Sequence, residues 1–89
     1  MKATIERIRQ METYFDILLQ ACSTAPQSIF QDDSLREIFR TLIDYYEGGQ
    51  WMRDYEADEQ GLLPPDLKRG VLSEDGVYNL LSDIESARS

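Results

Sequence analysis

Apolar residues recur every three or four positions along residues 2–22, which is the spacing of one face of an α-helix. Polar residues occupy the other side, and Pro26 cannot continue the helical hydrogen bonding. The pattern predicts a long N-terminal amphipathic helix followed by a loop over residues 23–33, in which Ile29 and Phe30 fold back onto the core. The predicted inner face of the helix is Ile5, Ile8, Met11, Phe15, Leu18, Leu19 and Cys22.

A second amphipathic helix is predicted for residues 34–47. Ser34 is followed three residues later by Glu37, a capping box in which each side chain satisfies a free backbone N–H group. Gly48 and Gly49 end the helix, because glycine adopts the left-handed cap conformation without steric cost. The predicted inner face is Leu35, Ile38, Phe39, Leu42, Ile43 and Tyr46.

A shorter helix is predicted to begin at Ser73, which caps it, and to run to about residue 86. Leu72 and Val77 flank the cap in the spacing of a hydrophobic staple. Gly76 is expected to weaken this helix by about 1 kcal/mol relative to alanine. Its predicted inner face is Val77, Leu80, Leu81 and Ile84.

The connecting segment, residues 48–72, carries apolar residues at intervals and is predicted to be ordered. Its start, around Trp51, fits one or two helical turns, and residues 65–70 fit a single turn with proline at its start and glycine at its end. No strand pattern is visible. The expected fold is therefore all-α: one domain over residues 1–89, with an antiparallel helical hairpin, the ordered segment and the third helix forming a three-helix bundle.

Composition narrows the function classes. The 89 residues include 17 acids and 9 bases, a net charge of −8, so a nucleic-acid partner is not expected. The acidity fits plain solubility, a cation site, or a surface for a basic protein. The sequence shows no secretory signal and no apolar run long enough for a membrane span, which predicts a soluble cytoplasmic protein without a membrane partner.

The residue types also limit the chemistry. The chain has no histidine, which removes imidazole-based catalysis and histidine-containing zinc sites. Cys22 is the only cysteine, so an internal disulfide is excluded, and its place on an apolar face predicts a structural thiol rather than a nucleophile. No phosphate-binding glycine loop is present. We therefore predict no catalytic residue, no cofactor and no enzymatic activity.

One acidic stretch is a candidate metal site. Alternating carboxylates resemble the opening of a calcium loop, but glycine is missing at the sixth position and glutamate at the twelfth. The candidate ligands are Asp54, Glu56, Asp58 and Glu59. The alternative is that these acids form ion pairs across the turn, with Arg53, Lys68 and Arg69 as their partners.

An aromatic cluster adjoins the acids and consists of Tyr45, Tyr46, Trp51, Met52 and Tyr55. It either closes the open end of the helical hairpin or anchors a protein partner, because Trp, Tyr and Arg dominate interface hot spots. The candidate partner-binding residues are Trp51, Arg53, Tyr55, Lys68 and Arg69.

A run of residue types in the second half of the chain carries a family resemblance. Its elements are Trp51, Asp54, residues 56–59, Gly61, Leu63-Pro64, residues 66–75 and Tyr78. This pattern, about a third of the chain, resembles the signature of a family of short bacterial proteins known only as domain of unknown function four-two-nine-eight. The loop at residues 23–33, and glycine rather than alanine at position 76, depart from it. The resemblance implies a small intracellular helical protein and supplies no activity.

Three functions remain open at this level. The first is a non-enzymatic interaction protein that presents residues 51–75, or its first helix, to an unknown protein partner. A homodimer is also expected to be feasible, because two helices and a short third leave apolar surface to cover. The alternative is a divalent-cation-binding protein that uses residues 54–59, with weak metal-assisted hydrolysis as a further option. Nucleic-acid mimicry ranks below both.

Overall fold

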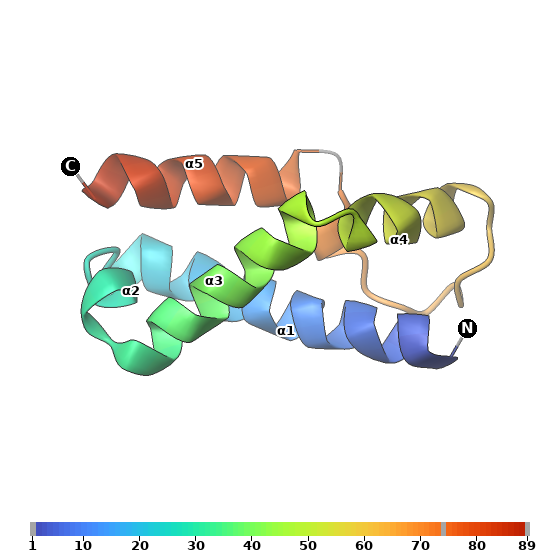
Figure 1. Cartoon of the computed structure of the whole chain (residues 1–89), viewed down its shortest axis with the longest axis horizontal. Helices are drawn as coiled ribbons and strands as arrows, with labels where there is room; N and C mark the ends of the chain where they lie inside the picture. Colours follow the sequence, from blue (N-terminus) through green and yellow to red (C-terminus); the bar gives the residue numbers. More distant parts are fainter. Residues whose placement is uncertain (1, 74, 89) are drawn as a thin grey trace.

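The long helix α1 is the element on which most of the other helical segments pack (Figure 1). The computed structural model describes residues 2–73 and 75–88, and these residues contain helices and no strand. The elements are α1 (Lys2–Thr24), α2 (Ser28–Gln31), α3 (Asp33–Glu47), α4 (Gln50–Glu59), the 3₁₀ turn η1 (Gly70–Leu72) and α5 (Gly76–Arg88). The all-α class is confirmed.

The arrangement differs from a three-helix bundle, because the described residues contain four helices of ten or more residues. The segment expected to hold one or two turns forms the ten-residue helix α4. In Figure 1, α3 crosses in front of α1 and runs back toward its N-terminal end, while α5 lies above the C-terminal half of α1. Both α3 and α5 pack on α1 but make little contact with one another.

Helix α1 has the predicted extent with two more residues, and Pro26 follows its end. Its periodicity was interpreted correctly for most of the inner face, including Ile8 and Leu18, which are fully buried. Two assignments were wrong. Leu19 is 42% exposed, whereas Glu12, which shares the polar half of the sequence pattern, is buried. Glu12 is buried because it accepts a hydrogen bond from η1, which is described below.

The expected loop at residues 23–33 contains the short helix α2. Ile29 is fully buried, and Phe30 meets Phe39 edge-on, with ring centroids 6.0 Å apart. The prediction that this segment folds back onto the core is confirmed. Gln27 ties the same region to the C-terminal helix, since its Nε2 donates a hydrogen bond to the Ala87 carbonyl at 2.6 Å.

The start of α3 shows that the capping box at Ser34 was wrong. The cap is Asp32, whose Oδ1 accepts a hydrogen bond from the Leu35 N–H at 3.0 Å. Aspartate is as good a cap as serine, and the earlier cap leaves Ser34 inside the first turn with an exposed side chain. The predicted end holds: α3 stops at Glu47, and Gly49 adopts the left-handed conformation with φ 97°.

The chain from residue 60 to η1 returns along the molecule without regular helix. Gly61 makes the turn with φ 71°, and Leu63 and Leu67 bury their side chains in the core. Residues 65–70 do not form the predicted helical turn. The Leu67 N–H donates to the Pro64 carbonyl at 3.2 Å, and helical geometry resumes only in η1. The segment is ordered through these two apolar contacts, as expected.

Helix α5 begins at Gly76, three residues later than predicted, and continues past residue 86. Ser73 nevertheless makes hydrogen bonds at the start of α5. The Ser73 Oγ accepts a hydrogen bond from the Gly76 N–H at 3.1 Å and donates one to the Gly70 carbonyl at 2.8 Å. Leu72 and Val77 are both buried, as the staple requires. Glu74, which the predicted helix includes, lies outside the described residues.

Glycine is required at position 76 because the surrounding atoms leave no room for a Cβ atom. The expectation that Gly76 weakens the helix relative to alanine was therefore misjudged. A Cβ atom there would lie 2.2 Å from Ser73 Oγ and 3.0 Å from the Gly70 carbonyl oxygen. We expect Gly76→Ala to lower the free energy of unfolding by about 1–3 kcal/mol, as for other overpacked sites, rather than raise it. Urea denaturation followed by circular dichroism measures this.

The double variant Ser73→Ala/Gly76→Ala provides the control for that prediction. It removes the closest atom, Ser73 Oγ, so the two substitutions should be less harmful together than the sum of their separate effects. Additive losses, or a more stable Gly76→Ala protein, would show that glycine is not needed for close approach.

Candidate functional site

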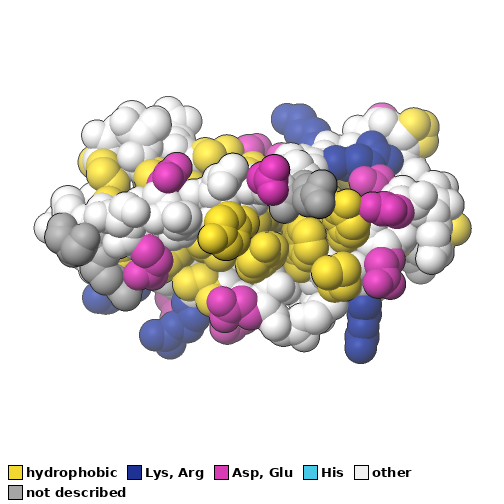
Figure 2. Space-filling view, turned by 90° about the horizontal axis from the view of Figure 1, so that it is seen from above, with side chains coloured by type: hydrophobic (Ala, Val, Ile, Leu, Met, Phe, Trp, Pro, Cys, Tyr) yellow, Lys and Arg dark blue, Asp and Glu magenta, His cyan; other side chains and the backbone are white. Residues whose placement is uncertain are grey.

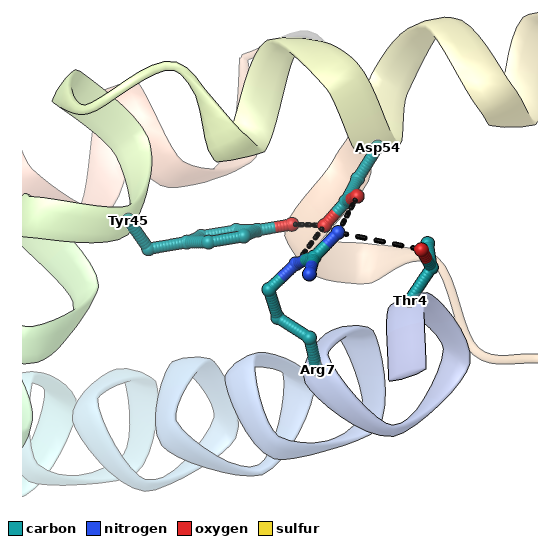
Figure 3. Close-up of polar contacts among 4 residues, drawn as sticks. All are labelled: Thr4, Arg7, Tyr45 and Asp54. Atoms are coloured by element: carbon teal, nitrogen blue, oxygen red, sulfur yellow. Dashed lines mark hydrogen bonds and ion pairs between the residues drawn. The ribbon is translucent and has the colours of Figure 1, made fainter. Parts of the chain in front are cut away.

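Three polar side chains from three helices meet in the interior (Figure 3). Asp54 of α4 is only 1% exposed. Arg7 of α1 binds it with two hydrogen bonds, from Nε to Oδ2 at 3.0 Å and from Nη2 to Oδ1 at 2.6 Å. The hydroxyl of Tyr45, from α3, donates to Oδ2 at 2.6 Å, and Thr4 Oγ1 accepts from Arg7 Nη2 at 3.5 Å. We call Arg7, Tyr45 and Asp54 the buried polar triad.

The triad holds α1, α3 and α4 together. A buried carboxylate is costly unless it is both paired and hydrogen-bonded, and here the guanidinium supplies the charge while the phenol occupies a further lone pair. The hydrogen bond to Asp54 is the main cause that raises the pKa of Arg7 above its ordinary value. The arrangement is that of a structural ion pair, in which both carboxylate oxygens are already engaged.

The burial of Tyr45, reinforced by its hydrogen bond to Asp54, raises the pKa of its phenol well above the ordinary value of 10.0. Above about pH 10 the unfolded chain ionises this tyrosine while the folded chain keeps it protonated, so stability must fall as the pH rises. We expect the unfolding equilibrium constant to increase by up to about tenfold per pH unit in that range.

Urea titrations between neutral pH and pH 11 measure this fall in stability, with Tyr45→Phe as the control. The variant should be less stable at neutral pH, by about 1 kcal/mol for the lost hydrogen bond, but should have a flatter pH profile. An equally steep profile in the variant would mean that Tyr45 is not responsible.

A second ion pair fastens the returning segment to α4. Arg69 Nε donates to Asp58 Oδ1 at 2.5 Å, and its other nitrogens donate to the carbonyls of Leu67 at 2.9 Å and Pro64 at 2.7 Å. The predicted pairing across the turn is thus present for Arg69. Within the described residues, Arg53 and Lys68 are exposed and form no ion pair.

The four candidate metal ligands are not brought together. Asp54 is committed to the buried polar triad and Asp58 to Arg69, while Glu56 and Glu59 are exposed on α4. Among the residues that the structure describes, no group of three or more acidic or cysteine side chains could hold a metal ion. The arrangement therefore offers no support for the cation site.

The candidate partner anchor Trp51 lies in the core, with 7% of its surface exposed. Its Nε1 donates to the Val71 carbonyl at 2.8 Å, its ring stacks on Tyr55 with centroids 5.1 Å apart, and Tyr46 meets it edge-on at the same distance. Trp51 joins α4 to η1. Of the five residues predicted to bind a partner, Trp51 and Arg69 thus have structural roles.

Glu12 is the residue that the pattern analysis missed. Its Oε1 accepts a hydrogen bond from the Val71 N–H at 2.8 Å, across 59 positions of the chain. A Cβ at Gly70 would lie 2.8 Å from the other carboxylate oxygen, so the backbone of η1 approaches this side chain closely. The sequence did carry a signal for the burial of Glu12, namely its helical spacing. Glu12 lies four residues after Ile8 and three before Phe15, which places it on the buried face.

A hollow of about 330 Å³ lies between α1 and residues 66–68. Its polar lining mixes both signs, and the lining residues are Arg9, Glu12, Thr13, Asp16, Asp66, Leu67 and Lys68. Glu12 is already engaged with η1.

Burial raises the pKa of the Cys22 thiol, which keeps it protonated at neutral pH and argues against a nucleophilic role. Within the described residues, every buried side-chain nitrogen or oxygen has a hydrogen-bond partner.

Apolar side chains gather on one face, near the start of α5 and the junction of α3 with α4 (Figure 2). Tyr78 of α5 is 62% exposed, the largest exposed fraction among the described large apolar residues. Tyr46, Tyr55 and Leu81 are half-buried and pack against the core. We call Tyr46, Tyr55, Tyr78 and Leu81 the apolar patch, of which Tyr46 and Tyr55 contact the Trp51 ring.

The fold and its interior define a small all-α protein in which distant segments are joined by buried polar contacts. The chain matches the family model described as domain of unknown function DUF4298 over residues 8–87, and it belongs to this family. The match confirms the resemblance and extends it to α3 and most of α1, although Arg7 of the buried polar triad precedes the matched residues. No curated protein and no solved structure matches the chain. No described helix is long and apolar enough to cross a membrane.

Proposed function

We propose that the protein is a non-enzymatic protein-interaction module and that the apolar patch is its binding surface. The observation that carries this proposal is the exposure of Tyr78, a large aromatic side chain on the outer side of α5. Aromatic residues, tyrosine and tryptophan above all, contribute most to protein interfaces. Exposing one beside further apolar side chains is unfavourable for an isolated chain and useful for a bound one.

The geometry of the neighbouring residues supports the same surface. Tyr46 and Tyr55 are held by contacts with the Trp51 ring, so their orientation is settled before a partner arrives. Rigid aromatic side chains lose little conformational entropy on binding. Tyr55 belongs to the residues first predicted to bind a partner. The polar groups best suited to catalysis, Asp54 and Tyr45, are instead buried in structural bonds.

A photo-crosslinking experiment tests the proposal. A photoreactive phenylalanine analogue replaces Tyr78 in one variant and Leu62 in another. Leu62 is the matched control, since it is 53% exposed but lies in the turn after α4 and is not a member of the apolar patch. After irradiation in cell lysate, we expect a discrete adduct from position 78 and none from position 62. No adduct at position 78, or the same adducts at both positions, would refute the proposal.

A further inference from the structure

The surroundings of the apolar patch carry a charge pattern that α-helix formation does not require. Figure 2 shows acidic side chains around the apolar centre. Helical spacing places Glu59 four residues after Tyr55 on α4, and Asp75 three residues before Tyr78 at the start of α5. Glu47 is the last residue of α3, so it lies at the same end of that helix as Tyr46. We call Glu47, Glu59 and Asp75 the acidic rim.

The members of the acidic rim are exposed and, within the described residues, none of them forms an ion pair. Glu59 is the last residue of α4, where the helix dipole disfavours negative charge, and the last turn of that helix has no basic residue. Glu47 ends α3 in the same unfavourable position. Local folding therefore does not account for the charges of Glu47 and Glu59, whereas an opposite charge on a bound molecule would. Asp75 precedes the N-terminus of α5, where negative charge is favourable.

We infer that the apolar patch with its acidic rim receives a basic amphipathic segment of a partner protein, a conclusion that rests on the proposed function. Such a segment would place its apolar side chains on Tyr78 and Leu81 and its Lys or Arg residues against the acidic rim. Opposite charges at the edge of an interface accelerate association and exclude wrong partners.

The same charges argue against other occupants of the apolar patch. A second copy of this chain would bring its own acidic rim and its own net charge of −8 against the first. An anionic membrane surface or a nucleic acid would be repelled for the same reason. A homodimer through this surface is therefore not the expected state.

Designed peptides test the inference by calorimetric titration of the full chain. The first probe is a helical peptide with leucine on one face and lysine on the other. The second has glutamate for each lysine, and the third has serine for each leucine. We expect only the first to bind, more weakly at high salt than at low salt because exposed charges are screened. Amide shifts in NMR spectra should map its contacts to the apolar patch.

Three variants, checked for an unchanged circular dichroism spectrum, decide where and how the first peptide binds. Tyr78→Ala should weaken its binding about tenfold or more, as expected for a hot-spot tyrosine. Glu59→Gln/Asp75→Asn should weaken it severalfold and reduce its salt dependence. The matched control Glu6→Gln/Glu37→Gln removes two exposed charges on the outer sides of α1 and α3 and should leave the affinity unchanged.

The outcomes separate this inference from the proposed function. Equal losses in the rim and control variants would reduce the binding to general attraction and overturn the inference. Binding of the glutamate peptide would do the same. Two further results would overturn the inference: binding to phosphatidylserine vesicles, and self-association in sedimentation. Either counts only if Tyr78→Ala abolishes it, because the apolar patch is then the surface responsible. If position 78 still crosslinks one protein while the peptides fail, only the partner chemistry is wrong. If position 78 crosslinks nothing, the proposed function fails first.

Discussion

Asp54→Ala is expected to lower the free energy of unfolding by about 3–5 kcal/mol, because it leaves the Arg7 guanidinium and the Tyr45 hydroxyl without their shared partner in the interior. A domain of this size has a stability of only a few kcal/mol, so the variant should be largely unfolded at room temperature. Circular dichroism and urea denaturation measure both effects.

Asp58→Ala is the matched control for this prediction. It removes a carboxylate from the same helix, one turn farther on, but its ion pair with Arg69 is partly exposed. Partly exposed pairs contribute little, and we expect a loss of about 1 kcal/mol or less. Similar losses for the two variants would mean that the buried polar triad has no special role in stability.

Trp51→Ala should destabilise the protein by about 3–5 kcal/mol, the usual cost of removing a buried tryptophan. The substitution opens a cavity beside Tyr55 and Tyr46 and leaves the Val71 carbonyl without its donor. Trp51→Phe keeps most of the packing and should cost less. Urea denaturation of the two variants separates the contribution of the ring from that of the hydrogen bond.

Tyr78→Ala is the surface control for Trp51→Ala and should change the stability by less than about 0.5 kcal/mol. The single tryptophan also gives an independent measurement, because a buried indole emits at shorter wavelength than one in water. A red-shifted emission from the native protein, or a Trp51→Ala variant as stable as the parent, would contradict the placement of Trp51 in the core.

These contrasts show why the candidate residues could be named from the sequence but not assigned to roles. The acids at positions 54–59 and the aromatic cluster were recognised as the unusual part of the chain. The structure divides them by depth: Asp54 and Trp51 are buried, while Glu59 is exposed and Tyr55 half-exposed. Depth depends on which side of α4 faces the core, and the weak amphipathicity of that helix does not indicate it.

The sequence by itself determined the features that depend on near neighbours. The extents of α1 and most of α3, the end of α3 at its glycines, the return of Ile29 to the core and the inner face of α5 follow from helical periodicity and local turn chemistry. These preferences act over a few residues. They can therefore be interpreted without knowing where the rest of the chain lies.

Only the tertiary structure decided the contacts between distant segments. Arg7 meets Asp54 across 47 positions, and Glu12 meets the Val71 N–H across 59. Each pair requires the relative placement of two elements, which is set by the packing of the whole core and has no periodic trace in the sequence. The space that demands glycine at position 76 has the same origin. The local pattern thus specified the helices, and their packing specified which polar residues stabilise the interior and which remain available to a partner.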